Sequence, residues 1–307
     1  MPTEDQVYSS NSADERIQSH RMSNLEQRQK AEALRALHGA KRVLLLANVW
    51  DVASARIIEE SGFPALATSS AGVAFSQGYA DGEKIPPHRM IAVIGRIAAA
   101  ISVPLTADVE AGYGRKPEDA ARTAGEVIEA GAVGMNLEDA TGDAAHPLLD
   151  MSVQLEKIRA VRQASEKAGV PLVLNARTDV YLLEVGEPGK RYDETLRRLA
   201  AFRDAGADCV FVPGLSDPST IGRLVADLKC PVNILAVAGS PSVAELAMLG
   251  VKRVSLGSGP MRATLGFLRR LATELQTKGT YTNLGGAPAY AEMNVLMSAN
   301  RNGDSEN

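Results

Sequence analysis

The sequence predicts a single (β/α)8 barrel of the TIM type, and three observations favour it. Eight apolar segments with strand character alternate along the chain with segments of helical spacing, an order typical of parallel α/β folds. Several strand segments are almost wholly apolar, as strands buried on both faces should be. A glycine ends helices ahead of strands in the phrases EAGAVG, DAGADC and MLGVKR. A doubly wound open sheet is the competing fold. The lack of a GxGxxG motif after the first strand disfavours its dinucleotide-binding version.

The predicted elements follow one another regularly. A leading helix is expected from Leu25 to Leu37, before the first strand. The eight predicted strands span 43–50, 64–69, 103–110, 133–140, 170–179, 208–214, 231–236 and 251–257. The predicted helices that follow them span 51–61, 87–101, a segment opened by Pro117, 152–168, 192–205, 218–228, 242–249 and 260–276. Two loops are expected, over 70–86 after the second strand and over 141–150 after the fourth.

Composition excludes several classes of protein. The 307 residues are 45% hydrophobic, enough for a barrel that uses up to about 250 residues. A net charge of −4 offers no basic face to nucleic acid or to an anionic membrane, and no apolar run reaches the ~18 residues that span a bilayer. Cys209 and Cys230 lack CxxC or zinc spacing, which predicts a cytoplasmic, disulfide-free protein.

Three regions are expected along the chain. Residues 1–24 are polar and are predicted to form a disordered extension. Residues 25–277 form the barrel. Residues 278–307 form a C-terminal tail that could hold a short helix, and its last residues, SANRNGDSEN, are polar and predicted to be disordered.

The segment PLTADVEAGYG, residues 104–114, carries the strongest local signal. Residues two apart on a strand share a face, so Asp108 and Glu110 are expected to point the same way. Two such carboxylates repel each other unless a cation lies between them, and oxygen ligands favour a hard ion such as Mg²⁺. The alternative is a strand end with two solvated acids and an ordinary glycine turn.

Polar residues gather where the predicted strands end, which is where barrel enzymes carry their catalytic groups. In chain order they are Asn48, Asp51, Ser69, Ser70, Asp108, Glu110, Glu138, Asp139, Asn175, Arg177 and Asp179. A single acid after a strand is usually a helix cap. Several acids at adjacent strand ends are electrostatically costly without a metal or a cationic partner. Arg177 could clamp a carboxylate or stabilise an oxyanion. The alternative for Arg177 is a structural ion pair with Asp179 or Glu138.

From about Leu37 to Leu275 the chain resembles the isocitrate lyase / phosphoenolpyruvate mutase superfamily. The phrases that carry the resemblance are ANVWDVASARIIEESGFPALATSSAG, TADVEAGYG, GMNLEDA, LNARTDV and FVPG. The resemblance implies a barrel whose last helix is swapped between subunits of a homodimer or a homotetramer. It also implies Mg²⁺ or Mn²⁺ and a small 2-oxo acid or enolpyruvate ligand.

The resemblance also implies roles for single residues. Asp108 matches the principal metal-contacting acid, and Glu110 and Glu138 match acids that hold the metal largely through its waters. Asp81 matches a loop aspartate near the metal, and Arg177 matches an arginine that neutralises developing negative charge. The implied substrate-binding positions are Ser69, Ser70, Ala71, Trp50, Asn175 and Arg177.

The loop 141–150 departs from the family pattern. Isocitrate and methylisocitrate lyases carry a KKCGH-type loop there, and mutases and phosphonopyruvate hydrolases carry a lysine-containing loop. Here the segment EDATGDAAHPLLD holds neither cysteine nor lysine, and His146 is its one candidate proton donor or acceptor. The alternative is an exposed loop histidine.

Three functions therefore remain open. The first is a Mg²⁺-dependent lyase that cleaves a C–C bond of a small 2-oxo or 2-hydroxy acid, by retro-aldol cleavage or decarboxylation, through a pyruvate enolate. The second is a phosphonomutase, or a hydrolase of a P–C bond. The third is a catalytically silent barrel that binds a keto acid.

Overall fold

The computed structural model describes residues 23–298 and confirms the barrel. All neighbouring strands pair in parallel, in the order β1-β9-β8-β7-β6-β5-β4-β3-β2. The strands are β1 (Leu44–Leu46), β2 (Asn48–Val49), β3 (Leu66–Thr68), β4 (Leu105–Asp108), β5 (Gly134–Glu138), β6 (Val173–Arg177), β7 (Cys209–Phe211), β8 (Val232–Leu235) and β9 (Arg253–Ser255). Because β1 and β2 are two parts of one predicted strand, interrupted at Ala47, the nine strands fill eight barrel positions.

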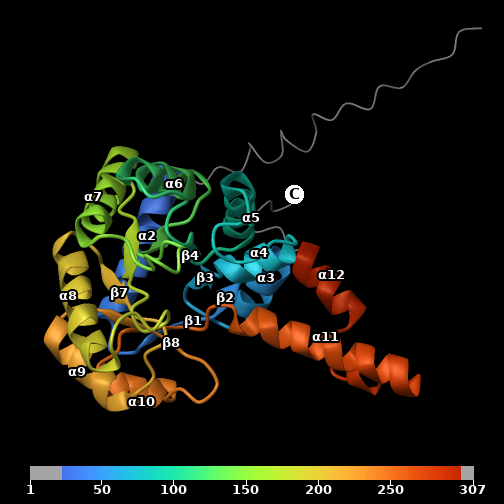
Figure 1. The fold of residues 1–307 in the computed structure, drawn as a ribbon. Helices are drawn as coiled ribbons and strands as arrows, with labels where there is room; N and C mark the ends of the chain where they lie inside the picture. The colour runs from blue at the N-terminus through green and yellow to red at the C-terminus, as the bar shows by residue number, and fades with distance from the viewer. Residues whose placement is uncertain (1–22, 299–307) are drawn as a thin grey trace, which may run out of the picture.

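The helices surround this ring (Figure 1). They are α2 (Asn24–Gly39), α3 (Val52–Glu60), α4 (Ser70–Ser76), α5 (Pro87–Ala100), α6 (Pro117–Glu129), α7 (Met151–Ala168), α8 (Arg191–Asp204), α9 (Pro218–Leu228), α10 (Val243–Met248), α11 (Gly259–Lys278) and α12 (Tyr290–Ser298), with 3-10 turns at η1 (Pro188–Lys190) and η2 (Thr282–Leu284). The predicted glycine stops are confirmed: Gly131 and Gly206, after α6 and α8, have φ of 93° and 116°.

Two predictions about these elements need correction. The segment 70–86 is not all loop, because Ser69 caps the short helix α4 by accepting a hydrogen bond from the N–H of Gly72 at 3.1 Å. The strand predicted over 103–110 ends at Asp108, so Glu110 belongs to the turn that follows. The predicted extension over residues 1–24 lies outside the described residues except for Ser23 and Asn24.

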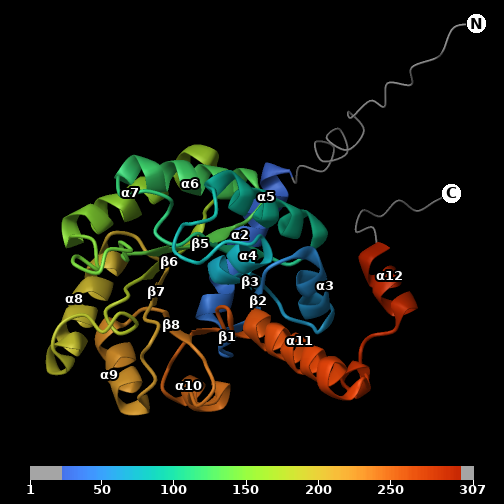
Figure 2. The same cartoon turned by 45° about the vertical axis from the view of Figure 1, so that its right-hand side comes forward.

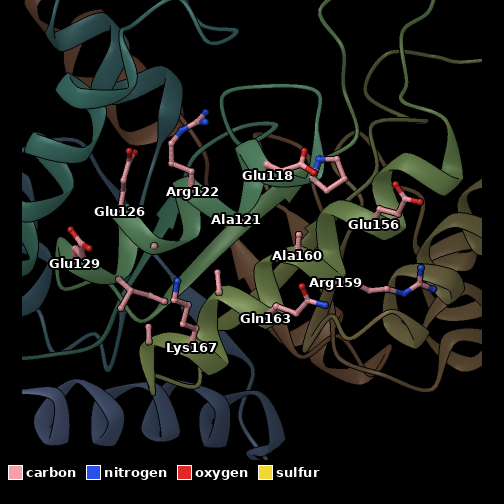
Figure 3. Close-up of a pocket in the computed structure, with 15 residues that line it drawn as sticks. Glu118, Ala121, Arg122, Glu126, Glu129, Glu156, Arg159, Ala160, Gln163 and Lys167 are labelled. Carbon is pink, nitrogen blue, oxygen red and sulfur yellow. The ribbon is translucent and has the colours of Figure 1, made fainter.

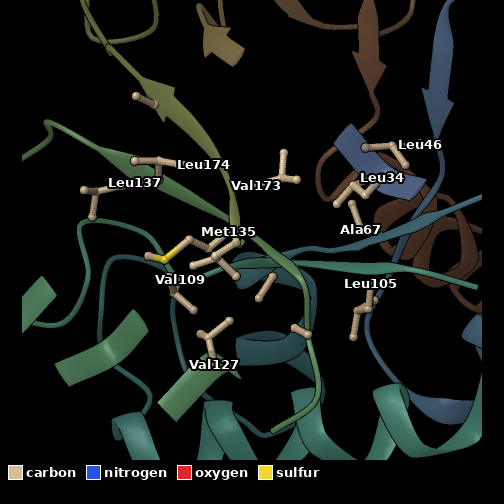
Figure 4. Packing of buried hydrophobic residues seen from close by; sticks show 14 of the residues in the cluster. Leu34, Leu46, Ala67, Leu105, Val109, Val127, Met135, Leu137, Val173 and Leu174 are labelled. Atoms are coloured by element: carbon tan, nitrogen blue, oxygen red, sulfur yellow. The ribbon is translucent and has the colours of Figure 1, made fainter. Parts of the chain in front are cut away.

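The core lies between the strand ring and the helices. Figure 4 shows side chains of β4, β5 and β6, including Leu105, Met135 and Leu174, packed with Val127 of α6. Each of these four residues is at least 98% buried. Burial of ~25 cal/mol for each Å² of apolar surface holds the ring closed, and the strand ends are thereby fixed relative to one another.

Helix α2 covers the end of the barrel at which the strands begin. Its Leu34 lies against Gly134, the first residue of β5, and Arg35 donates to the carbonyl of Pro171 at 3.2 Å. His38 on the same helix is 4% exposed, and its Nδ1 lies 2.8 Å from the carbonyl oxygen of Leu34. Burial, and then the charge of Arg253, lower the pKa of His38 to about 4.

Buried His38 predicts a loss of stability in acid. Because its pKa is lower in the folded than in the unfolded chain, the unfolded chain takes up the proton first as pH falls below ~6.5. We expect the unfolding free energy to fall by about 2–3 kcal/mol more between pH 7 and pH 4.5 in the wild type than in His38→Gln. Urea unfolding at both pH values measures this difference, and identical losses in the two proteins would refute the assignment.

The last helices stand apart from the ring. Figures 1 and 2 show α11 projecting from the barrel and α12 folding back beside α3, where Arg56 donates to the carbonyl of Leu296 at 2.5 Å. Within residues 23–298, no helix is long and apolar enough to cross a membrane.

Candidate active site

Asp108 ends β4 at the rim of the barrel and is 7% exposed. Its Oδ2 accepts hydrogen bonds from the backbone N–H of Ser70 at 3.0 Å and from the Ser70 hydroxyl at 2.9 Å. Its Oδ1 accepts one from Nδ2 of Asn136 at 3.2 Å. Three donors on two adjoining elements therefore fix the orientation of this carboxylate.

Glu110 reaches the same region through a turn. Its φ of 54° places it in the left-handed region, where residues other than glycine are uncommon. Its Oε2 accepts the backbone N–H of Glu83 at 2.6 Å. Its Oε1 is buried, and no residue of the described chain hydrogen-bonds to it. The shared strand face predicted for Asp108 and Glu110 is thus wrong, but both side chains still belong to one acidic cluster.

Two loops clasp each other around Glu110. Glu83, in the loop after α4, donates its N–H to Glu110, while its own Oε1 accepts the N–H of Tyr113 at 2.6 Å. Glu83 and Tyr113 also have left-handed backbones, with φ of 59° and 55°. Each such conformation costs on the order of 1 kcal/mol or more, so the surrounding contacts must hold it.

Lys157 of α7 hydrogen-bonds to the backbone of the turn that carries Glu110. It is fully buried, and its Nζ donates to the carbonyls of Ala111 at 2.5 Å and Gly114 at 2.7 Å. Burial lowers the pKa of Lys157 to about 8. The sequence did not single out this lysine, because a lysine on an amphipathic helix is normally exposed.

Replacing Lys157 with Met should loosen the turn. Two buried carbonyls then lose their donor, so we expect the unfolding free energy to fall by about 2–4 kcal/mol. Lys167→Met, at the exposed end of the same helix, should change it by less than ~0.5 kcal/mol. Urea unfolding of both variants checks this, and equal effects would show that the two carbonyl contacts contribute nothing.

Glu138, Arg177 and Asp179 form one charged chain at the ends of β5 and β6. Nη1 of Arg177 lies 2.7 Å from Oε2 of Glu138, and its Nε and Nη2 donate to the two oxygens of Asp179 at 2.5 and 2.8 Å. The guanidinium also lies 5.6 Å from the ring centre of Phe211. The structural ion pair considered for Arg177 is therefore real and involves both acids. Three of its five N–H groups are used in these contacts, which leaves two to meet a ligand.

The acids of the cluster crowd one another. Burial first, and then the charges of Asp81 and Asp108, raise the pKa of Glu110 to about 8. Burial likewise holds the pKa of Glu138 well above its usual range, although Arg177 opposes this. Burial opposes the charge on Arg177, but Glu138 and Asp179 outweigh it and raise its pKa. Such crowding is relieved by a cation.

Asp139, the residue directly after β5, supports this chain. It is fully buried and accepts the Thr178 hydroxyl at 2.7 Å, the N–H of Asp179 at 3.0 Å and Nη1 of Arg198 at 3.1 Å. Burial raises the pKa of Asp139 to about 6. Arg198 also donates to the carbonyl of Leu149 at 3.0 Å. The same guanidinium thus holds the end of the 141–150 loop and the segment that carries Asp179.

Five further predicted residues lie near Asp108 or at the barrel rim. Ser70 contacts Asp108 directly, Ser69 and Ala71 flank it, and Trp50 packs against this segment, since a Cβ on Gly72 would lie 3.2 Å from that of Trp50. Asp81 lies at the exposed rim, where the surrounding protein, and then the charge of Asp108, raise its pKa.

Two predicted residues are not brought to the rim cluster. Asn175 is fully buried two residues before Arg177 on β6, inside the barrel. The side chain of His146 is 82% exposed, and its Nδ1 lies 3.5 Å from Oδ2 of Asp143. The alternative of an exposed loop histidine therefore describes His146 in this structure.

The donor set fits a magnesium-type ion, although not a closed cage. Residues 23–298 contain no group of three or more His, Cys, Asp or Glu side chains placed to ligate a metal together. Mg²⁺ typically keeps several waters and takes one or two carboxylates. Asp108 offers a carboxylate for such an ion. Oε1 of Glu110, which has no hydrogen-bond partner among the described residues, offers a second oxygen in the same cluster. The roles of these residues as metal ligands stay a prediction.

A large groove lies elsewhere on the protein. Figure 3 shows it between α6 and α7, with Glu118, Arg122, Glu129, Arg159 and Lys167 among its lining residues. Its volume is about 1120 Å³. It contains none of the predicted site residues, so its size does not make it the candidate active site.

Comparison with known proteins places this geometry in context. A protein-family model described as phosphoenolpyruvate phosphomutase matches residues 34–276. A candidate lyase/mutase from Burkholderia cenocepacia J2315 has a crystal structure that is 39% identical, with a TM-score of 0.84, over 89% of this chain and 97% of that chain.

Two further similar proteins carry named activities. The chain is 30% identical to an oxaloacetate decarboxylase from Rhodopseudomonas palustris strain BisB5, over 89% of this chain and 90% of that protein. It is 28% identical to 2,3-dimethylmalate lyase, a PEP mutase/isocitrate lyase superfamily member, with a TM-score of 0.77 over 87% of this chain and 94% of that chain.

Proposed function

The chain belongs to the phosphoenolpyruvate phosphomutase family, within the isocitrate lyase / PEP mutase superfamily, and from that premise we propose that it is a Mg²⁺-dependent carbon–carbon lyase. Its substrate is a small 2-oxo or 2-hydroxy carboxylic acid. Decarboxylation of a 3-carboxylated 2-oxo acid leaves a pyruvate-type enolate, and retro-aldol cleavage of a 2-hydroxy acid leaves a 2-oxo acid and the enolate-type anion of the departing carboxylate. One observation carries the proposal: Arg177, held by Glu138 and Asp179, lies in the same acidic cluster as Asp108. A fixed guanidinium, next to acids whose mutual repulsion a metal ion would relieve, can stabilise the negative charge that develops on an enolate.

The residues divide the work as follows. Asp108 would hold the ion directly, and Glu110 and Glu138 would hold its waters. When bound, Mg²⁺ would act as a Lewis acid toward the 2-oxo group. The Ser69–Ala71 segment, adjacent to Asp108, would orient the substrate carboxylate. The two unused N–H groups of Arg177 would face the oxygen that gains negative charge. Asp81 and the clasp between Glu83 and Tyr113 would close the rim against water.

The 141–150 loop favours decarboxylation among the lyase reactions. Retro-aldol cleavage of a 2-hydroxy acid needs a base to take the hydroxyl proton and an acid to protonate the departing carbanion, and the loop supplies no cysteine or lysine as this acid. In the decarboxylation of a 3-carboxylated 2-oxo acid, the C3–C4 bond breaks, its electron pair passes into the enolate and CO₂ leaves. A solvent proton then adds to C3. This reaction needs no proton donor from the loop, because solvent protonates C3, and the similarity to an oxaloacetate decarboxylase supports it.

A panel of substrates tests the proposal. The protein is incubated with Mg²⁺ and oxaloacetate, methylisocitrate, dimethylmalate or phosphonopyruvate, and products are followed by ¹H and ³¹P NMR. Because Mg²⁺ alone slowly decarboxylates oxaloacetate, protein-free and Asp108→Asn samples are the controls. Pyruvate-type products above these controls support the lyase. Phosphate or phosphoenolpyruvate from phosphonopyruvate would replace it with the mutase or hydrolase, and ligand binding without turnover would indicate a silent barrel.

We further propose a homodimer or homotetramer built through α11. The projecting helix exposes Leu265, Leu268 and Leu275, and α12 exposes Tyr290 and Val295. Exposed apolar faces of this kind mark interaction sites, and a swapped last helix would bury them. Light scattering measures the mass, and a monomer at micromolar concentration would contradict this part. Cytoplasmic location stays a prediction.

A further inference from the structure

A polar layer lies inside the barrel, one step below the candidate active site. Asn136 and Asn175 precede Glu138 and Arg177 by two residues on β5 and β6, so they share the same inward face but lie deeper. Arg253 enters the same layer from β9 and is fully buried. Barrel interiors are usually filled by branched apolar side chains, so this layer calls for a physical account.

The hydrogen bonds of Asn136 have a fixed direction. Its Oδ1 accepts Nδ2 of Asn175 at 2.8 Å and Nη2 of Arg253 at 3.4 Å. Arg253 can only donate, so a flip of the Asn136 amide would set its NH₂ group against the guanidinium. The amide nitrogen must therefore face upward, where it donates to Oδ1 of Asp108 at 3.2 Å. The cation below thus determines which way Asn136 points toward the acid above.

Burying the charge of Arg253 costs folding free energy. Its Nε and Nη1 have no hydrogen-bond partner within residues 23–298, and no carboxylate of this range lies within ion-pair distance of it. A buried charge without a direct partner opposes folding. An apolar side chain of similar length would fill the same space without this penalty. Retention of an arginine here is explained if its charge and its hydrogen bond serve the site above.

We propose that Arg253 and Asn136 are positioning residues for Asp108, and that they aim its carboxylate at a divalent cation. Neither residue touches the ligand. Asn136 donates once to Oδ1 and Ser70 donates twice to Oδ2, so one of the four lone-pair sites of the carboxylate, on Oδ1, is left among the described residues for a cation. This inference rests on the proposed function, because it takes the metal at Asp108 as its premise.

The test measures cation binding directly, without turnover. Mn²⁺ is titrated into the wild type, Arg253→Met and Asn136→Leu, and free Mn²⁺ is read by electron paramagnetic resonance. Outer-shell partners of metal ligands typically account for about 10- to 100-fold in affinity, and we expect a loss of this size in both variants. The melting temperature of Arg253→Met should be equal to or above that of the wild type, because a buried charge without a direct partner has been removed.

Asn233 provides the matched control. It is a fully buried asparagine that pairs in register with Arg253 on the neighbouring strand, but its Nδ2 donates to the hydroxyl oxygen of Ser255 at 3.2 Å and it makes no hydrogen bond to Asn136 or Asp108. Asn233→Leu should bind Mn²⁺ within ~2-fold of the wild type. A loss shared equally by this control would show a general effect of interior substitutions and would overturn the positioning role.

The outcomes separate the two proposals. If the wild type binds Mn²⁺ and both Arg253→Met and Asn136→Leu bind it equally well, the positioning role is wrong while the metal site stands. If the wild type binds no Mn²⁺, the metal site fails and the positioning role fails with it. Should Arg253→Met not fold, Asn136→Leu with its control decides the question alone.

Discussion

An Asp108→Asn variant should retain its fold and lose Mg²⁺-dependent turnover by about a thousandfold or more. The substitution keeps the shape of the side chain, and its amide oxygen can still accept the N–H and hydroxyl of Ser70, although its NH₂ group then faces the NH₂ group of Asn136 and that one hydrogen bond is lost. What it removes is the negative charge that binds the ion. Because Asp108 also contributes to the raised pKa of Glu110, removing its charge relieves repulsion within the cluster. The unfolding free energy should therefore change by no more than about 1–2 kcal/mol.

Asp51 supplies the control for this variant. It is another aspartate that follows a strand, but its Oδ1 caps α3 by accepting the N–H of Ser54 at 2.7 Å. Asp51→Asn preserves that cap, because asparagine is an equally good capping residue. Kinetics with Mg²⁺ should therefore be normal in Asp51→Asn. Full activity in Asp108→Asn would remove Asp108 from the site altogether.

Arg177→Met should damage both activity and stability. Turnover should fall by about 10²- to 10³-fold, because a fixed donor to the developing enolate is lost. The unfolding free energy should fall by about 3–5 kcal/mol, because Glu138 and Asp179 are left as buried carboxylates without their cation. Steady-state kinetics and urea unfolding of the same preparation report the two effects.

A double variant separates these two roles of Arg177. Adding Glu138→Gln to Arg177→Met removes one uncompensated charge, so part of the lost stability should return. Turnover should not return, because the guanidinium of Arg177 is still missing and Glu138, which would hold waters of the metal, is altered as well. Restored turnover in the double variant would show that Arg177 acts only by balancing Glu138.

The sequence predicted the barrel because its signals are local and repeated. Strand runs, glycine stops such as Gly131, and acids at strand ends need no knowledge of distant contacts. Arg177 and Glu138 were predicted together because they end two consecutive strands, and the register confirms that they face each other.

The parts that the sequence missed depend on single contacts. The capping hydroxyl of Ser69 was a readable signal for α4, since serine before a run of small helix-forming residues is a common helix start. The left-handed turn at Glu110 was not readable, because glutamate rarely adopts it and the clasp from Glu83 is needed to hold it.

Lys157 and Arg253 were missed for a related reason. Periodicity treats a charged residue as exposed, yet both side chains are fully buried. Their partners are carbonyl and amide oxygens far away in the sequence: Ala111 and Gly114 for Lys157, and Asn136 for Arg253. Only the closed barrel brings these groups together.

The most direct test of the account is a calorimetric titration of oxalate into the wild-type protein, with Mg²⁺ and with EDTA. Oxalate is a planar dianion that resembles the enolate of a 2-oxo acid in shape and charge. If Asp108 holds a metal and Arg177 faces the enolate oxygen, oxalate should bind in Mg²⁺ and show no measurable binding in EDTA. Equal binding in EDTA, or no binding in either buffer, would contradict the proposed site.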